Sequence, residues 1–276
     1  MKNFILILLL LSSTISLASA NEKCTLLIPF PPGGASEINA RSLQIGNSNI
    51  GIEYKPGAYG NSAINYMNKS KNTFLLSPAM MYSANNPNKD LNVKMNRIVF
   101  GSSVKIITIK NYTLNDLLTK PLKIGIHNPG SQFEAFAKEI KNKNTKIIIV
   151  ITGSDVKALP MIMNGDLDVY FSTGPNVDAW TKMFDNIKVI GEIPFNETIN
   201  IGEIKLKNLS FAAIFTNKGL TKEEEIIIDN CLDQATNNQK FSEYVIKNNI
   251  PHLKVDKNVS TNLLEEYIKY LQNYGL

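Results

Sequence analysis

The stretch Pro29-Phe30-Pro31-Pro32-Gly33-Gly34-Ala35-Ser36 joins two segments of different character. Residues 25–28 before it are apolar and β-prone, which is typical of a strand, and residues 36–44 after it have the apolar spacing of an amphipathic helix. The first amides of a helix have no partner within the helix, and glycines leave the turn open to close approach. We therefore predict a strand, a turn and a helix whose free amides bind an anion.

Two further segments have recognisable patterns. The turn Tyr54-Lys55-Pro56-Gly57-Ala58-Tyr59-Gly60-Asn61 follows a predicted strand, and residues 159–169 run from a helix through Gly165-Asp166-Leu167-Asp168 into another strand. Together with the opening turn and its Glu37, they resemble the extracytoplasmic solute-binding receptors of tripartite tricarboxylate transporters, called Bug-type receptors. That family's turns read PFPPGGxS/T-D/E and NRPGAGGN, from which Tyr54, Lys55 and Tyr59 depart. The resemblance covers essentially the whole chain after residue 20.

The resemblance implies an α/β fold of two lobes, each a mostly parallel sheet flanked by helices, with the ligand cleft between the lobes. The alternation of predicted strands and helices along the chain indicates the same architecture. We expect one lobe to combine residues 21–102 with residues 211–276, and the other to span residues 103–210. The chain would then cross between the lobes twice.

Residues 1–20 have the pattern of a cleaved signal peptide: Lys2, an apolar core over residues 4–11 and the ending Ala18-Ser19-Ala20. We predict cleavage after Ala20 and export to the periplasm. The apolar core is much shorter than the roughly 20 residues of a membrane-spanning helix. A lipid anchor on Cys24 is the less favoured alternative, because no lipobox precedes that cysteine.

Basic residues outnumber acidic ones, with 29 Lys and Arg against 24 Asp and Glu, but they are spread along the chain without a run of five. This distribution argues against nucleic-acid binding and indicates a lysine-rich surface with mild attraction for anions. Only two arginines are present, Arg41 and Arg97, which limits how a guanidinium group can hold a carboxylate ligand. We expect a monomer.

Two cysteines, Cys24 at the first strand and Cys231 on a late helix, are candidates for a disulfide in an exported chain. The bridge requires the last helices to return to the first lobe. Two separate buried thiols are an equal alternative, since cysteine packs well as a small apolar residue.

Three local patterns give further predictions. Residues 146–151 are continuously apolar after Lys146, which is typical of a fully buried strand. Residues 85–96 are rich in asparagine and predict a loop. Helices with capping-box spacing are expected to begin at Ser131, with Glu134, and at Thr221, with Glu224.

Catalytic and metal-binding patterns are sparse. His127 and His252 have no metal-ligand spacing, and the nucleotide-binding motifs GxxxxGK[ST] and GxGxxG are absent. An exported serine hydrolase that uses Ser131 or Ser36 on a small ester or amide is the alternative function, although the motif GxSxG is also absent. An adhesion domain with an incidental cleft is a third hypothesis. We expect no catalytic residues, no cofactor and no metal.

The favoured hypothesis, which the resemblance implies, is a periplasmic substrate-binding receptor. It would close two lobes over a small carboxylated organic solute and hand it to the membrane components of a tripartite tricarboxylate-type transporter. Main-chain amides and hydroxyls would hold the carboxylate, aromatic and proline side chains would cover the carbon skeleton, and Arg41 would serve the surface. The predicted ligand-binding residues are Phe30, Pro32, Gly33, Gly34, Ala35, Ser36, Asn128, Gly130, Ser131, Gln132, Thr152 and Ser172.

Overall fold

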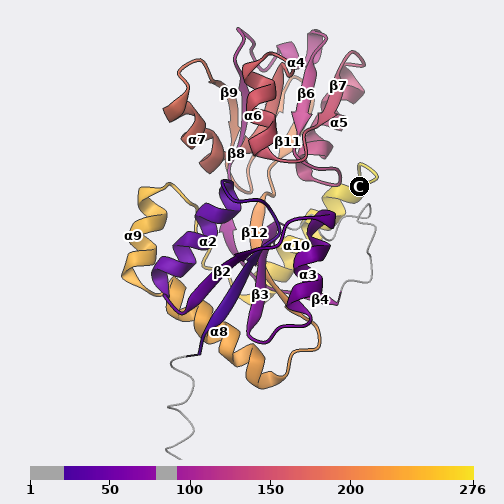
Figure 1. Ribbon diagram of the computed structural model, residues 1–276. Helices are drawn as coiled ribbons and strands as arrows, with labels where there is room; N and C mark the ends of the chain where they lie inside the picture. Colours follow the sequence, from indigo (N-terminus) through magenta and orange to yellow (C-terminus); the bar gives the residue numbers. More distant parts are fainter. Residues whose placement is uncertain (1–21, 79–91) are drawn as a thin grey trace, which may run out of the picture.

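The computed structural model describes residues 22–78 and 92–276. The predicted signal peptide and most of the predicted loop at residues 85–96 lie outside the described residues. The described chain contains two five-stranded sheets, one above the other in Figure 1, and a two-stranded hairpin.

The first sheet combines strands from the start of the chain with one strand from late in the chain. These strands are β1 (Cys24–Ile28), β2 (Ile50–Tyr54), β3 (Thr73–Pro78), β4 (Val93–Gly101) and β12 (Phe211–Asn217), and their order is β2-β1-β3-β12-β4. The helices around them are α2 (Ala35–Gly46), η2 (Ala58–Gly60), α3 (Asn61–Met67), α8 (Lys222–Thr236), α9 (Gln239–Lys247) and α10 (Lys257–Gln272). Apolar side chains of α2, α8 and α9 form one core cluster with the sheet, and those of α3 and α10 form another.

The second sheet is built from the middle of the chain. Its strands are β5 (Val104–Thr108), β6 (Lys123–Ile126), β7 (Ile148–Ile151), β8 (Val169–Thr173) and β9 (Lys188–Ile193), in the order β7-β6-β8-β5-β9. Its helices are α4 (Asp116–Thr119), α5 (Gln132–Lys143), α6 (Asp155–Met163) and α7 (Gly174–Met183), and the hairpin is β10 (Thr198–Ile201) and β11 (Ile204–Lys207). Below, each sheet with its helices is called a lobe.

Each sheet has four strands that run in one direction and a single strand that runs in the other. The antiparallel strand is β12 in the first sheet and β5 in the second. Each of these strands directly follows a passage of the chain between the sheets, from β4 to β5 and from β11 to β12. The structure thus confirms the predicted α/β architecture of two mostly parallel sheets flanked by helices.

Asn208 lies where the two passages meet and is fully buried. Its side-chain amide donates to the carbonyl oxygens of Ser102 at 2.7 Å and Ile193 at 2.8 Å. Its side-chain oxygen accepts from Gln132 Nε2 at 3.0 Å and from the amide of Ser210 at 2.7 Å. One side chain therefore satisfies polar groups on both passages and on the start of α5.

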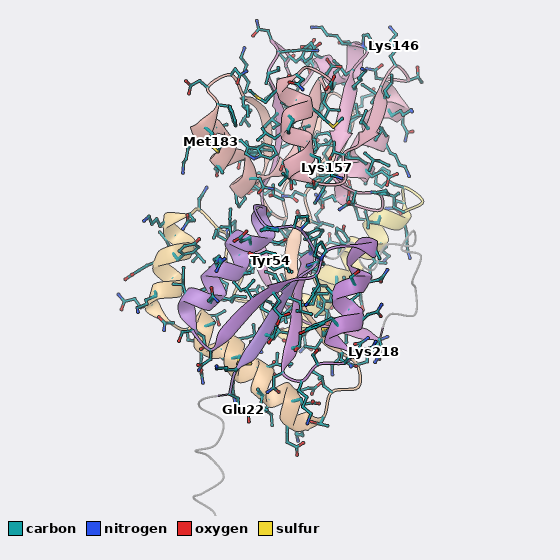
Figure 2. The ribbon with its side chains drawn as sticks, viewed as in Figure 1. Glu22, Tyr54, Lys146, Lys157, Met183 and Lys218 are labelled. Carbon is teal, nitrogen blue, oxygen red and sulfur yellow. A yellow bond between two sulfur atoms is a disulfide. The ribbon has the colours of Figure 1, made fainter. Side chains whose placement is uncertain are left out.

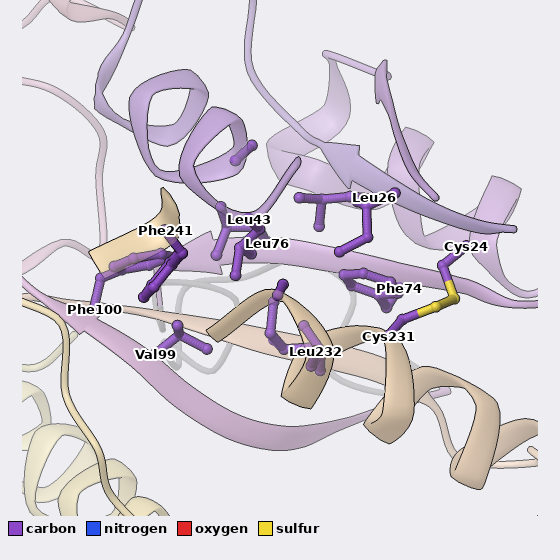
Figure 3. Packing of buried hydrophobic residues seen from close by; sticks show 14 of the residues in the cluster. Cys24, Leu26, Leu43, Phe74, Leu76, Val99, Phe100, Cys231, Leu232 and Phe241 are labelled. Atoms are coloured by element: carbon purple, nitrogen blue, oxygen red, sulfur yellow. A yellow bond between two sulfur atoms is a disulfide. The ribbon is translucent and has the colours of Figure 1, made fainter. Parts of the chain in front are cut away.

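The last helices return to the first lobe, where α8 packs beside α2 and β1 (Figure 1). The condition for the disulfide is thus met, and Cys24 and Cys231 are bridged across 207 positions of sequence. Figure 3 shows the bridge at one end of a cluster that contains Leu26, Phe74 and Leu232. The bridge therefore ties the first strand to a helix from the end of the chain.

Two local predictions need correction. Strand β7 is an edge strand, and Ile148 and Ile151 are each 56% exposed, so the prediction of a fully buried strand at residues 146–151 is wrong. Continuous apolar character does not distinguish a central strand from an edge strand. Within the predicted loop, residues 93–96 belong to β4, where their backbone pairs with β12.

Replacing both Cys24 and Cys231 by serine should lower the free energy of unfolding by about 2–5 kcal/mol, because the bridge restricts a very long loop of the unfolded chain. Urea denaturation of the oxidised wild type and of the double variant measures this difference. Equal stability of the two proteins would contradict the expectation.

Replacing Asn208 by alanine should lower the free energy of unfolding by about 2–4 kcal/mol, because buried groups that lose their partner cost about 1–3 kcal/mol each. The matched control is Asn200→Ala, which removes an exposed asparagine from β10. The control should change the stability by less than about 0.5 kcal/mol. If the two variants unfold at the same urea concentration, the structural role of Asn208 is refuted.

Candidate ligand-binding site

A cavity of about 90 Å³ lies between the two lobes. In Figure 2, Tyr54 at the end of β2 and Lys157 in the first turn of α6 mark the facing sides of the lobes. Apolar side chains, including Phe30, Val156 and Phe211, form much of the wall. The polar residues of the wall are Ser36, Asn39, Ser102, His127, Ser154, Asp155, Thr173 and Ser210.

The start of α2 brings part of the predicted anion-binding turn to the cavity, where Gly34, Ala35 and Ser36 line the wall. Gly34 is the N-cap residue, and no side chain caps the helix. Within the described chain, the amides of Ala35 and Ser36 have no protein acceptor. These two amides and the helix end are therefore available to an anion.

Gly33 and Pro32, also predicted to bind the ligand, lie outside the wall and are exposed. The amide of Gly33 donates to Glu37 Oε2 at 2.8 Å, and this hydrogen bond lowers the pKa of Glu37. Arg41 forms an ion pair with Glu37 at 3.3 Å on the protein surface. In this turn, Glu37 thus uses one of the predicted donors, while the adjacent Pro31 contributes to the wall.

The corresponding turn of the second lobe has the same local geometry. The amide of Gly130 donates to Glu134 Oε2 at 2.7 Å, and the Ser131 hydroxyl caps α5 by accepting from the amide of Glu134. The same hydroxyl donates to the carbonyl oxygen of Asn128 at 2.6 Å. Gln132 is buried and bonds to the segment between β11 and β12.

Asn128, Gly130, Ser131 and Gln132 all lie outside the cavity wall, whereas His127 of the same turn lines it. The His127 ring faces Phe30 of the other lobe, with the ring centroids 5.8 Å apart. In the part of the chain that the structure describes, no hydrogen bond joins His127 to Ser131. Ser131 and His127 therefore do not form the Ser–His pair that a hydrolase acting through Ser131 requires.

Of the other two predicted residues, Ser172 contacts a carboxylate that sequence reasoning did not identify. The Ser172 hydroxyl donates to Asp155 Oδ1 at 2.8 Å, and Asp155 lines the cavity. Thr152 is buried and its hydroxyl donates to the carbonyl oxygen of Ile126 at 3.1 Å. In the sequence, Asp155 follows the helix-capping Ser154, so it resembles an ordinary first-turn acid.

Neither arginine lines the cavity. Arg97 is engaged in ion pairs with Asp229 at 2.7 Å and Asp233 at 2.6 Å, which fasten β4 to α8. Among the described side chains, no group of three His, Cys, Asp or Glu residues is placed to hold a metal ion. No helix of the described chain has the length and apolar character of a membrane span.

No protein-family model matches the sequence, and no curated protein matches it. Solved structures do match. A Rhodopseudomonas palustris protein with adipate has a TM-score of 0.76 at 14% identity, covering 92% of this chain and 96% of that chain. The periplasmic binding protein BugD has a TM-score of 0.72 at 12% identity, covering 92% and 97%. MatC from Rhodopseudomonas palustris, with bound malate, has a TM-score of 0.71 at 12% identity, covering 91% and 98%.

These likenesses concern the fold. The chain has the fold of Bug- and TctC-type solute-binding proteins, as the sequence resemblance predicted. Two of the similar structures are a periplasmic binding protein and a solute-binding protein, and two others were solved with malate and with adipate.

Proposed function

We propose that the chain is a periplasmic receptor that binds a small carboxylated solute between its lobes and delivers it to the membrane components of a tripartite tricarboxylate-type transporter. The observation that carries the proposal is the cavity at the uncapped start of α2, where the amides of Ala35 and Ser36 have no acceptor in the described chain. The similar structures with malate and adipate support a carboxylate ligand.

The main chain can supply the necessary binding free energy without an arginine. Hydrogen bonds to a charged group contribute about 1.5–3 kcal/mol each, and a helix end adds about 0.3–1 kcal/mol. Two amides and the Ser36 hydroxyl would thus contribute a large part of the roughly 8 kcal/mol of micromolar binding. Phe30, Pro31 and Phe211, which line the cavity, would cover the carbon skeleton.

The proposal includes the lobe boundaries, with residues 21–102 and 211–276 in one lobe and residues 103–210 in the other. Membership of the strands in the two sheets supports this division. A signal peptide cleaved after Ala20 would export the chain to the periplasm, where it would act as a monomer. The Bug- and TctC-type fold supports this location.

Gly34→Val should weaken carboxylate binding at least tenfold, because its side chain would stand beside the free amides of α2. The variant should fold, since Gly34 has an extended backbone and a Cβ there meets no atom within 4 Å. Arg41→Ala, which removes an exposed side chain outside the wall, should change the affinity less than about twofold.

Calorimetry with malate, adipate and their straight-chain homologues measures both variants against the wild type. Circular dichroism confirms that the variants are folded. Retained affinity in Gly34→Val together with lost affinity in Arg41→Ala would refute the backbone site.

Binding should close the lobes, because the free amides of α2 and the polar groups of α6 and β8 lie on different lobes. The lobes approach each other at the cavity, where the ring centroids of Phe30 and His127 are 5.8 Å apart. We therefore expect the ligand to reduce the radius of gyration in small-angle scattering. Gly34→Val should show no such reduction at the same ligand concentration. An unchanged radius for wild type saturated with a bound ligand would rule out closure.

A further inference from the structure

Asp155 is, apart from His127, the one ionisable side chain among the described residues that line the cavity. It is the first residue of α6 in the second lobe, whereas the free amides of α2 belong to the first lobe. No lysine or arginine of the described chain forms an ion pair with Asp155. The cavity therefore has a negative charge on one side that no cationic side chain neutralises.

Neutral donors from two other elements hold this carboxylate in place. Oδ1 accepts from the Tyr170 hydroxyl at 2.9 Å and the Ser172 hydroxyl at 2.8 Å, and Oδ2 accepts from Asn176 Nδ2 at 2.9 Å. All three donors are at least nine-tenths buried. Burial and the charge of Asp155 raise the pKa of Tyr170, which keeps the phenol a neutral donor. An acidic side chain that only stabilised the N-terminal end of α6 would not require hydrogen bonds from β8 and α7.

Two further oxygens at the cavity lack hydrogen-bond partners. Asn39 on α2 is 8% exposed, and its side-chain oxygen is buried without a donor. The Thr173 hydroxyl at the end of β8 is also buried without a partner. Both residues line the cavity. A buried acceptor without a donor is unfavourable, so the Asn39 oxygen favours a ligand that brings N–H groups, whereas the Thr173 hydroxyl can accept from such a group or donate to an acceptor.

We propose that the ligand is a zwitterion, whose carboxylate faces the start of α2 and whose ammonium group faces Asp155. This inference rests on the proposed receptor function and narrows its class of ligand from carboxylates to amino acids. An ammonium group has three donors and no acceptor, which suits Asp155 together with the unpaired oxygens of Asn39 and Thr173. Asp155 is thereby the residue that determines specificity.

A dicarboxylate as long as the amino acid would place a second negative charge in the cavity, where the amino acid has its ammonium group. Its second carboxylate would face Asp155, and like charges repel most strongly where water is scarce. Among the described residues of the wall there is no lysine or arginine that would offset this repulsion. The cavity thus disfavours dicarboxylates on the side where it favours amines.

The test uses matched pairs of probes. Straight-chain amino acids from glycine to 6-aminohexanoate are each compared by calorimetry with the dicarboxylate of equal length, so that no separation between the two charged groups needs to be assumed. Wild type should bind at least one amino acid at least tenfold more tightly than its dicarboxylate partner. Asp155→Asn should weaken that amino acid at least tenfold and strengthen the dicarboxylate.

The matched control is Asp166→Asn, which removes the same charge from an exposed position beyond the other end of α6. It should bind both probes as wild type does. Dicarboxylate binding by Asp155→Asn also shows that this variant is folded.

The outcomes separate the two proposals. Tighter binding of dicarboxylates by wild type would overturn the zwitterion inference and leave the receptor function standing. If Asp155→Asn binds the amino acid as tightly as wild type does, the zwitterion inference is also overturned, and the receptor function is unaffected. If wild type binds no probe of either class, the proposed carboxylate receptor itself fails.

Discussion

The structure depends on how the polar groups of two chain passages are satisfied where the sheets meet. A cavity between two lobes requires the backbone to pass from one sheet to the other, and buried backbone groups there need partners. Asn208 supplies them with one carboxamide, which bonds to Ser102, Ile193, Gln132 and Ser210. These bonds involve both passages and the start of α5, and they act together with the backbone bond from Ser102 to Ser210 and the bond from Leu209 to Gln132 to fix the relative position of the two cavity walls.

The turns before α2 and α5 share one hydrogen bond. In each, a glycine that follows a proline donates its amide to a glutamate four residues later, Gly33 to Glu37 and Gly130 to Glu134. The glutamate takes a donor that an anion would otherwise use, so the free donors of α2 begin at the next residues. In the second lobe, Ser131 also caps the helix. The uncapped start of α2 and the capped start of α5 therefore favour the first lobe for the proposed anion site.

Local patterns predicted much of the fold, because strands, glycine turns and helix caps depend on neighbouring residues. The same reasoning selected Gly34, Ala35 and Ser36, which line the cavity, since a helix start is a local feature. It failed where the answer depends on distant residues. Whether β7 is an edge strand depends on the order of strands, and Asp155 becomes distinctive only when Tyr170, Ser172 and Asn176 surround it. Nothing in the sequence near Asp155 indicates those partners.

The charge of the cavity is opposite to the charge of the chain. The sequence has a formal net charge of +5, which attracts anions over the distance that salt screening allows. The described residues of the wall, however, include Asp155 and neither lysine nor arginine. The long-range field therefore favours the approach of any carboxylate, while the wall distinguishes among carboxylates at contact. The proposed zwitterion would meet both conditions, since its carboxylate would face α2 and its cation would face Asp155.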